Sequence, residues 1–182
     1  DAVVEAGLLE VVVAAMETHH RAIEVQSRSC YAIAATCHGR KRNGDRFVEA
    51  GGMACLLKVL SSNGSQNWEV RANACSCLKS LCHENEAVQR RAVAADAIKK
   101  ILVAMGADRE SRSLQLEGAR ALMQLTSDPE RGALMPDDGI RIVEEALERF
   151  TDGAFQREVA RYGRMLREGR SRVTEKGERQ RR

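Results

Sequence analysis

Apolar side chains recur along this chain at intervals of three, four and seven residues. One triplet with the spacing i, i+3, i+7 occurs four times, as Leu9/Val12/Met16, Met53/Leu56/Leu60, Ile98/Ile101/Met105 and Ile140/Val143/Leu147. Side chains at these intervals lie on one face of an α-helix, whereas a half-buried strand needs strict alternation. The pattern therefore predicts four amphipathic helices. The last residues of successive triplets are 44, 45 and 42 residues apart.

A second helical pattern follows each triplet after a short polar linker. It starts at Val25, Val70, Leu114 and Phe155, and each start is followed by Gln or Arg. The +4, +8 and +11 positions from these starts are Ser29/Ile33/Thr36, Ala74/Leu78/Leu81, Gly118/Leu122/Leu125 and Val159/Gly163/Leu166. Because the starts are 45, 44 and 41 residues apart, the chain repeats one unit of a little over 40 residues.

Short segments ahead of the triplets predict a third helix in each unit. Residues 45–50 and 86–95 are long enough for one or two helical turns, and Asp128-Pro129-Glu130 is typical of an N-cap followed by a proline at the first helical position. A sharp turn should separate each short helix from the next, near Gly7, Gly51-Gly52, Asp96-Ala97 and Gly139.

The composition fits a stacked array of helices. Of the 182 residues, 43% are hydrophobic but only 3% are aromatic, so Ala, Val, Leu, Ile, Met and Cys fill the apolar positions. Small side chains at +4 let neighbouring helices approach closely, and each repeat then buries its face against the next. The sequence predicts an all-α solenoid.

The order of short helix, glycine turn, second helix, polar linker and third helix resembles the armadillo repeat. Ala15-Met16-x-x-His19, then Glu24-Val25-Gln26, Cys30 and Ala32-Ile33, is similar to a variant found in armadillo-repeat proteins, including the solenoid region of leucine-rich-repeat kinases. The resemblance covers residues 3 to about 166. HEAT repeats are the alternative, but they usually lack the glycine turn and the short first helix.

The resemblance implies a right-handed superhelix of about four three-helix repeats, over residues 1–38, 39–83, 84–126 and 127–166. The first would be incomplete and the last degenerate, with Arg161, Gly163 and Arg164 giving the last a more polar outer face, as a capping repeat needs. The chain opens at Asp1 within a unit, so we expect it to be the C-terminal part of a longer protein. Residues 167–182 hold seven Arg or Lys against three Glu and are expected to form a flexible basic tail.

Third helices of armadillo proteins line a concave groove that binds extended peptides or partner helices. In nuclear-import receptors of this family a Trp and an Asn on successive third helices bind basic peptides. The matching +6/+10 positions here are Tyr31/Ala35, Ser76/Ser80, Arg120/Gln124 and Arg161/Met165, so that pattern is absent. The residues we expect at the groove are Tyr31, Ser76, Ser80, Arg120, Gln124 and Arg161. An acidic or phosphorylated partner would suit the last three; alternatively, these are solvated charges on an unused face.

Two further sites have competing interpretations. Trp68 follows the polar linker 61–67, which we expect to be mobile, and it is either an exposed contact residue or a side chain packed over the start of its own helix. His19-His20 is expected to be a solvated pair, since no Cys or acidic partner lies at metal-binding spacing.

The six cysteines predict buried, reduced thiols because five of them fall within the second helical pattern. Cys37-His38 and Cys82-His83 recur 45 residues apart, but a separation of about one repeat (~10 Å) would be too large to share a zinc ion.

No phosphate-binding glycine loop, nucleophile elbow or His-Glu-x-x-His helix occurs, so we expect neither catalysis nor a cofactor. Acidic neighbours such as Asp137-Asp138 and Glu144-Glu145 point about 100° apart on a helix and do not face a common substrate.

The function expected from the sequence is a protein-binding scaffold in the reducing cytoplasm. No apolar stretch is long enough to cross a membrane and no signal segment opens the chain. Two alternatives remain. The basic tail could attach the protein to nucleic acid or an anionic membrane, although it has no aromatic residue for base stacking. The chain could also be a constitutive subunit of a large assembly, docked through its open first repeat.

Overall fold

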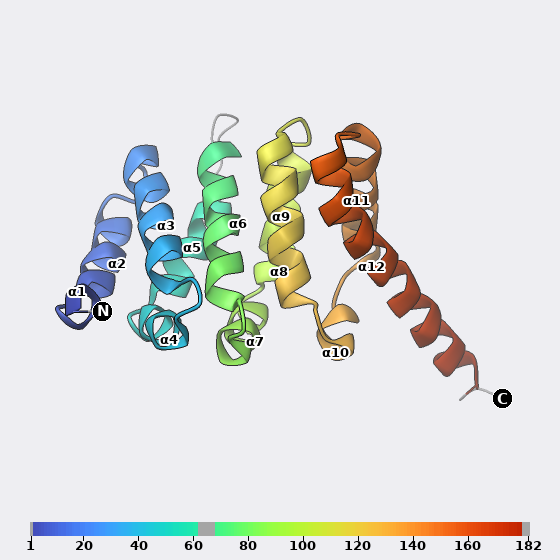
Figure 1. Ribbon diagram of the computed structural model, residues 1–182, viewed down its shortest axis with the longest axis horizontal. Coiled ribbons are helices and arrows are strands. Elements are labelled where there is room, and N and C mark those ends of the chain that lie inside the picture. The colour runs from blue at the N-terminus through green and yellow to red at the C-terminus, as the bar shows by residue number, and fades with distance from the viewer. Residues whose placement is uncertain (1, 62–67, 180–182) are drawn as a thin grey trace.

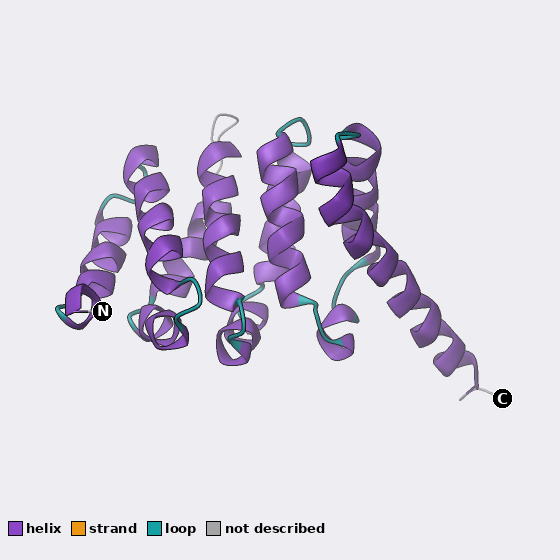
Figure 2. Cartoon of the chain, in the orientation of Figure 1, coloured by secondary structure: helices purple, strands orange, loops and turns teal. Residues whose placement is uncertain are grey.

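The computed structural model describes residues 2–61 and 68–179, and helices connected by short turns account for this part of the chain, without a strand in it (Figure 2). The helices are α1 (Ala2–Glu5), α2 (Leu8–Thr18), α3 (Ile23–Cys37), α4 (Lys41–Glu49), α5 (Gly52–Leu60), α6 (Trp68–Cys82), α7 (Glu86–Ala94), α8 (Ala97–Ala107), α9 (Arg112–Leu125), α10 (Pro129–Gly132), α11 (Asp137–Arg149) and α12 (Gly153–Arg179). The protein is therefore all-α, as the sequence predicts.

The long helices form two layers (Figure 1). Helices α3, α6, α9 and α12 lie side by side in one layer, and α2, α5, α8 and α11 lie in the other. Each helix of the first layer packs against its neighbour in the row and against the helix that precedes it in sequence. The short helices α4, α7 and α10 lie along one edge of the two layers. We call α3, α6, α9 and α12 the third helices, and the solvent-facing side of their row the third-helix face.

The predicted apolar positions form the core between these layers. Leu56, Ile101 and Val143 are buried at the centre of their triplets, whereas Val12, their counterpart in α2, is only partly buried. In the third helices the +8 residues Ile33 and Leu78 are also fully buried. The helical registers derived from the sequence are thus confirmed in α5, α8 and α11, whereas in α2 the buried residue between Leu9 and Met16 is Val13.

Left-handed residues make the turns before α2, α5 and α8, at Gly7 (φ 97°), Gly51 (φ 85°) and Asp96 (φ 63°). The prediction for Gly139 is wrong, because Gly139 lies inside α11 and the extended residue Pro136 precedes that helix instead. A Cβ on Gly139 would come within 2.7 Å of Leu102 Cδ1. The glycine therefore permits close helix packing rather than a turn.

The short helices occur where the sequence predicts them, but not all of them begin at the predicted residue. Helix α4 begins at Lys41, four residues before the expected start, while α7 begins at Glu86 as expected. Asp128 caps α10 as predicted, since its Oδ1 accepts a hydrogen bond from the Arg131 backbone N–H (3.0 Å).

Helix α12 continues well past the predicted boundary at residue 166. The sequence predicted a flexible tail over 167–182, but the backbone is helical as far as Arg179. No proline interrupts residues 167–179, and the Arg, Glu and Lys residues there have high helix propensity. Residues 180–182, and the linker residues 62–67 that were expected to be mobile, lie outside the described residues. Within the described part, no helix combines the length and apolar character needed to cross a membrane.

Candidate functional site

The third-helix face is formed by four helices that are far apart in sequence and lie side by side (Figure 1). Tyr31 of α3 is 75% exposed and projects from one end of the row. On α6, Ser76 is partly exposed, but Ser80 is buried and its hydroxyl donates to the Ser76 backbone carbonyl (3.0 Å). Of these predicted groove residues, Tyr31 therefore offers a large surface and Ser80 offers little.

Arg120 of α9 is already paired within the protein. Its guanidinium donates to both carboxylate oxygens of Glu158 on α12, with an Nη2–Oε1 distance of 2.6 Å, and also contacts Glu117. Lys79 Nζ on α6 donates to Glu117 Oε2 at 3.0 Å. The four residues form a charged chain across α6, α9 and α12. The hydrogen bond from Arg120 lowers the pKa of Glu158 below its usual range, which keeps this carboxylate ionised.

The charged chain changes the expected chemistry of the face. The sequence predicted that Arg120, Gln124 and Arg161 would together meet an acidic ligand. Arg120 instead has two carboxylate partners, and Gln124 is partly buried. Arg161 is exposed on α12, with the half-exposed Met165 one turn away. The accessible features of the face are thus an aromatic end at Tyr31 and a cationic end at Arg161. Glu158 was missed because only the alignment of α9 with α12 brings it to Arg120.

A hydrogen bond and a ring contact join α3 to α6 and the residues that follow them. Asn73 Nδ2 donates to Ser27 Oγ (2.7 Å), and the rings of His38 and His83 stack with centroids 5.2 Å apart and planes 8° from parallel. The two histidines are closer than the ~10 Å expected from the repeat spacing, because their side chains reach toward each other. Among the described residues, no group of three or more His, Cys, Asp or Glu is arranged to hold a metal ion.

All six cysteines are free and buried, as the sequence predicts. Burial raises the pKa of the Cys30 thiol to about 12 and that of the Cys82 thiol to about 12. A thiol with such a pKa is neutral at physiological pH and is a poor nucleophile or metal ligand. Cys30, Cys75, Cys77 and Cys82 therefore act as small apolar residues of the third helices, and Cys55 does so on α5.

The remaining candidates from the sequence lie at helix ends. Trp68 is the first residue of α6 and is 42% exposed, so its side chain is neither fully packed nor fully free. His19 is the residue after α2, and the exposed ring of His20 has Nδ1 3.3 Å from the backbone oxygen of Glu17. These two histidines lie on the solvated surface.

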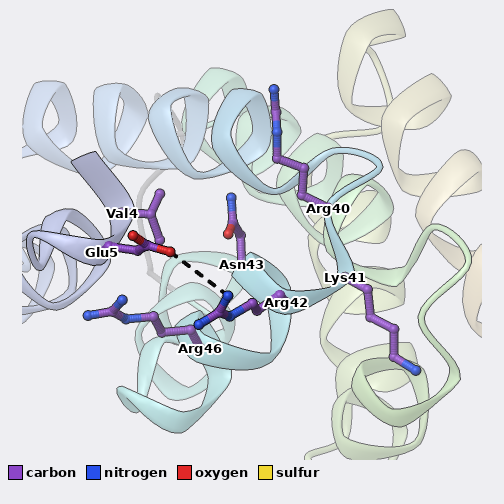
Figure 3. Close-up of a pocket in the computed structure, with 7 residues that line it drawn as sticks. All are labelled: Val4, Glu5, Arg40, Lys41, Arg42, Asn43 and Arg46. Atoms are coloured by element: carbon purple, nitrogen blue, oxygen red, sulfur yellow. Dashed lines mark ion pairs between the residues drawn. The ribbon is translucent and has the colours of Figure 1, made fainter. Parts of the chain in front are cut away.

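A cavity of about 270 Å³ lies beside α1 and α4 (Figure 3). Its lining residues are Val4, Glu5, Arg40, Lys41, Arg42, Asn43 and Arg46. Arg42 faces Glu5 with an Nη1–Oε1 distance of 3.8 Å, whereas Lys41 points away from this pair. Arg46 Nε donates to Glu10 Oε1 (2.7 Å), and this bond lowers the pKa of Glu10.

The cavity lining is basic, with four Arg or Lys residues against Glu5, but Arg42 and Arg46 already have carboxylate partners in Glu5 and Glu10. The cavity was not predicted from the sequence, although the run Arg40-Lys41-Arg42 was a visible signal. A free anion would have to compete with Glu5 and Glu10 for these arginines. The third-helix face, with Tyr31 and Arg161 exposed, is the better candidate for binding.

The sequence matches no protein-family model and no curated protein. The fold is similar to the crystal structure of an engineered protein from the Northeast Structural Genomics Consortium, with a TM-score of 0.77 and 26% sequence identity. The match covers 92% of this chain and 66% of that chain, so this chain spans about two thirds of the engineered protein's length. This similarity supports the all-α architecture.

Proposed function

We propose that this chain is a non-catalytic protein-interaction module with the architecture of an armadillo-type right-handed α-solenoid. Three observations support the architecture: the recurring order of short, second and third helices, the left-handed residues before three of the second helices, and the side-by-side row of third helices. Each unit in such an array packs against its neighbours and leaves one broad face for a partner.

The observation that carries the proposal is the continuity of the third-helix face. Side chains bridge each pair of adjacent third helices, through Asn73–Ser27, Lys79–Glu117 and Arg120–Glu158. These contacts fix the spacing of the helices before any partner arrives. A preorganised surface loses less conformational entropy on binding than a mobile one.

The partner we propose is a protein segment that contacts both ends of this face. Tyr31 supplies a large, exposed aromatic side chain with few rotatable bonds, which is typical of energetically dominant interface residues. Arg161 supplies an exposed guanidinium that can bind a carboxylate or a phosphate with two hydrogen bonds. These features fit a protein segment that has an apolar pocket or side chain at one end and an acidic or phosphorylated residue at the other.

The test is quantitative affinity capture from the source cells with the whole chain as bait. The double variant Tyr31→Ala/Arg161→Glu should lose the specific partners, with at least about a tenfold drop in recovery, since loss of an aromatic anchor alone costs over 1 kcal/mol. The matched control is the double variant Val103→Ala/Arg90→Glu, which makes comparable changes at exposed positions of α8 and α7.

Recovery of the same proteins by both double variants would refute binding through the third-helix face. Recovery of nothing above background by the wild-type chain would refute the interaction module itself.

A second candidate function uses the basic end of α12. Residues 167–182 contain seven Arg or Lys against three Glu, and α12 extends beyond the two layers in Figure 1. Such a helix could bind phosphates of RNA or of an anionic membrane. Binding to poly(U) or to phosphatidylserine vesicles would then fall steeply with salt and vanish on deletion of 167–182, whereas partner capture by the third-helix face would survive the deletion.

A further inference from the structure

One side of α12 carries arginines where the other third helices carry neutral residues. The +2 and +12 positions are Ser27/Cys37 in α3, Ala72/Cys82 in α6 and Leu116/Thr126 in α9, but Arg157/Arg167 in α12. The +9 residue of α12 is Arg164. Arg157 and Arg164 are both exposed and lie seven residues apart, which is about two helical turns. We call Arg157, Ala160 and Arg164 the basic flank.

Contacts inside the row show that the +2 and +9 positions face the next third helix. Ser27 at +2 of α3 accepts a hydrogen bond from Asn73 of α6 (2.7 Å). Lys79 at +9 of α6 donates to Glu117 at +3 of α9 (3.0 Å). Because α12 turns its own +3 residue toward α9, the basic flank points away from α9.

Two features of the described residues indicate that a further repeat does not cover the basic flank. Such a repeat would bury Arg157 and Arg167 where the other units bury neutral side chains, and burial of a charge is costly. In addition, the other third helices end at +11 or +12 and a short helix begins by +16, whereas α12 stays helical through these positions to Arg179. The turn into a short helix is therefore absent at its equivalent place in this unit.

The charge of the basic flank defines the partner that fits it. Among the described residues, Arg157 and Arg164 make no ion pair. Inside the row, the position of Arg164 is taken in α6 by Lys79, which pairs with Glu117 on the neighbouring helix. A helix that carries a carboxylate in the place of Glu117 would therefore pair with Arg164, and an acidic residue two turns along it would meet Arg157.

We propose that the basic flank binds an acidic α-helix of a partner protein, which packs beside α12 as the third helices pack beside one another. Ala160 lies between the two arginines in sequence, and its small side chain lets a second helix approach closely. This inference goes beyond the proposed function, because the arginines of the flank are not the +6 residues Tyr31 and Arg161 of the third-helix face.

The test is fluorescence anisotropy of the whole chain with a labelled, alanine-rich helical peptide that carries glutamates at i, i+4 and i+7. In about 50 mM salt it should bind with a dissociation constant below about 100 µM. A peptide of the same composition with its glutamates spread around the helix should bind at least about tenfold more weakly, because its charges do not match the flank.

Arg157→Ala/Arg164→Ala should weaken binding of the first peptide by at least about tenfold. The matched control is Arg91→Ala/Lys99→Ala, which removes two exposed cations from α7 and α8 and should leave the affinity unchanged. Circular dichroism should show the same helical content for both double variants, because all four side chains are exposed.

No binding up to about 1 mM peptide overturns the proposal, and so does equal binding of the two peptides or an unchanged affinity in Arg157→Ala/Arg164→Ala. Tighter binding of poly(U) or phosphatidylserine vesicles, lost in the same variant, would also overturn it by assigning the flank to phosphates. Tyr31→Ala should leave peptide binding unchanged. Failure of the flank and failure of the third-helix face can therefore be told apart.

Discussion

At the scale of single residues, a glutamine at the same repeat position joins the second helix to the third in three of the units. Gln26 Nε2 donates to the backbone oxygens of Met16 (2.9 Å) and His19 (3.0 Å) at the end of α2. Gln115 does the same for Met105 and Asp108, and Gln156 for Leu147 and Phe150. These side chains donate to carbonyl groups at the helix end, such as that of Met16, which the helix itself leaves without a partner, and add a second donor to the turn carbonyls of His19 and Asp108.

The second unit replaces this glutamine with Arg71. Its side chain is 7% exposed and forms an ion pair with Asp108, at the turn between α8 and α9. The arginine thus links its own unit to the next one. The sequence showed the recurring polar residue after each start, but not its hydrogen-bond acceptors, because those of the glutamines lie 6 to 10 residues earlier across a turn and that of Arg71 lies in the next unit.

We expect Gln115→Leu to destabilise the protein by about 1–3 kcal/mol, since the buried Met105 carbonyl would lose its hydrogen-bond donor and the Asp108 carbonyl would keep only the Ser111 backbone N–H. For a chain of this size that corresponds to a fall in Tm of roughly 2–4 °C per kcal/mol, measured by circular dichroism. Gln124→Leu on the same helix is the matched control, because Gln124 is partly exposed, and it should change Tm little. Equal losses from both variants would show that the buried hydrogen bonds are not the cause.

At the scale of helices, most elements follow from sequence periodicity alone. The triplets predicted α2, α5, α8 and α11, and the second pattern predicted the third helices, because 3.6-residue periodicity over 9 to 15 residues is a strong signal. The errors concern Gly139 and the extent of α12. Gly139 lies at the start of a triplet, where a turn glycine and a packing glycine look alike in sequence. Local charge suggested a flexible tail over 167–182, whereas helix propensity over the same residues favoured continuation.

The junction between α9 and α12 should be sensitive to acid. Arg112 donates to both carboxylate oxygens of Asp152 (2.8 and 2.6 Å), and Asp152 Oδ1 also accepts from the Phe155 backbone N–H (3.0 Å) at the start of α12. The hydrogen bond from Arg112 is the main reason why the pKa of Asp152 lies well below its usual range. A lowered folded-state pKa stabilises the folded state above the unfolded-state pKa near 4, and this contribution is lost as pH falls further.

We expect Asp152→Asn to reduce the pH dependence of α12 opening below about pH 4, measured by hydrogen exchange of its amides. Amide protection of α12 should already be lower at neutral pH in this variant. Glu148→Gln, an exposed carboxylate change on α11, provides the control and should keep the wild-type pH profile. An unchanged acid profile in Asp152→Asn would mean that another group controls this junction.

At the scale of the whole molecule, the row of third helices depends on every unit in it. Leu78 is buried at the centre of α6, which packs against both α3 and α9. The face that the row presents was only partly predictable. The exposure of Tyr31 and Arg161 follows from their positions on the helices. The pairing of Arg120 with Glu158, 38 residues later, depends instead on how α9 and α12 align.

Leu78→Asp should therefore unfold at least two adjacent units, because it places an unpaired carboxylate in the core at a cost of several kcal/mol. Arg161→Ala should leave the fold intact, since Arg161 is exposed. Thermal unfolding by circular dichroism separates the two outcomes. Equal thermal midpoints for the two variants would contradict the helical register described above.

The three junctions between third helices also differ mechanically. A pulling force along the row acts on them in series, so their extensions add and the softest junction yields first. Asn73–Ser27 and the stacked imidazoles join α3 to α6 without ionic contacts among these groups, whereas charged pairs join α9 to α12. Salt weakens only the second kind of contact. The contacts between α9 and α12 should therefore weaken as ionic strength rises, whereas the hydrogen bond between Asn73 and Ser27 should change little.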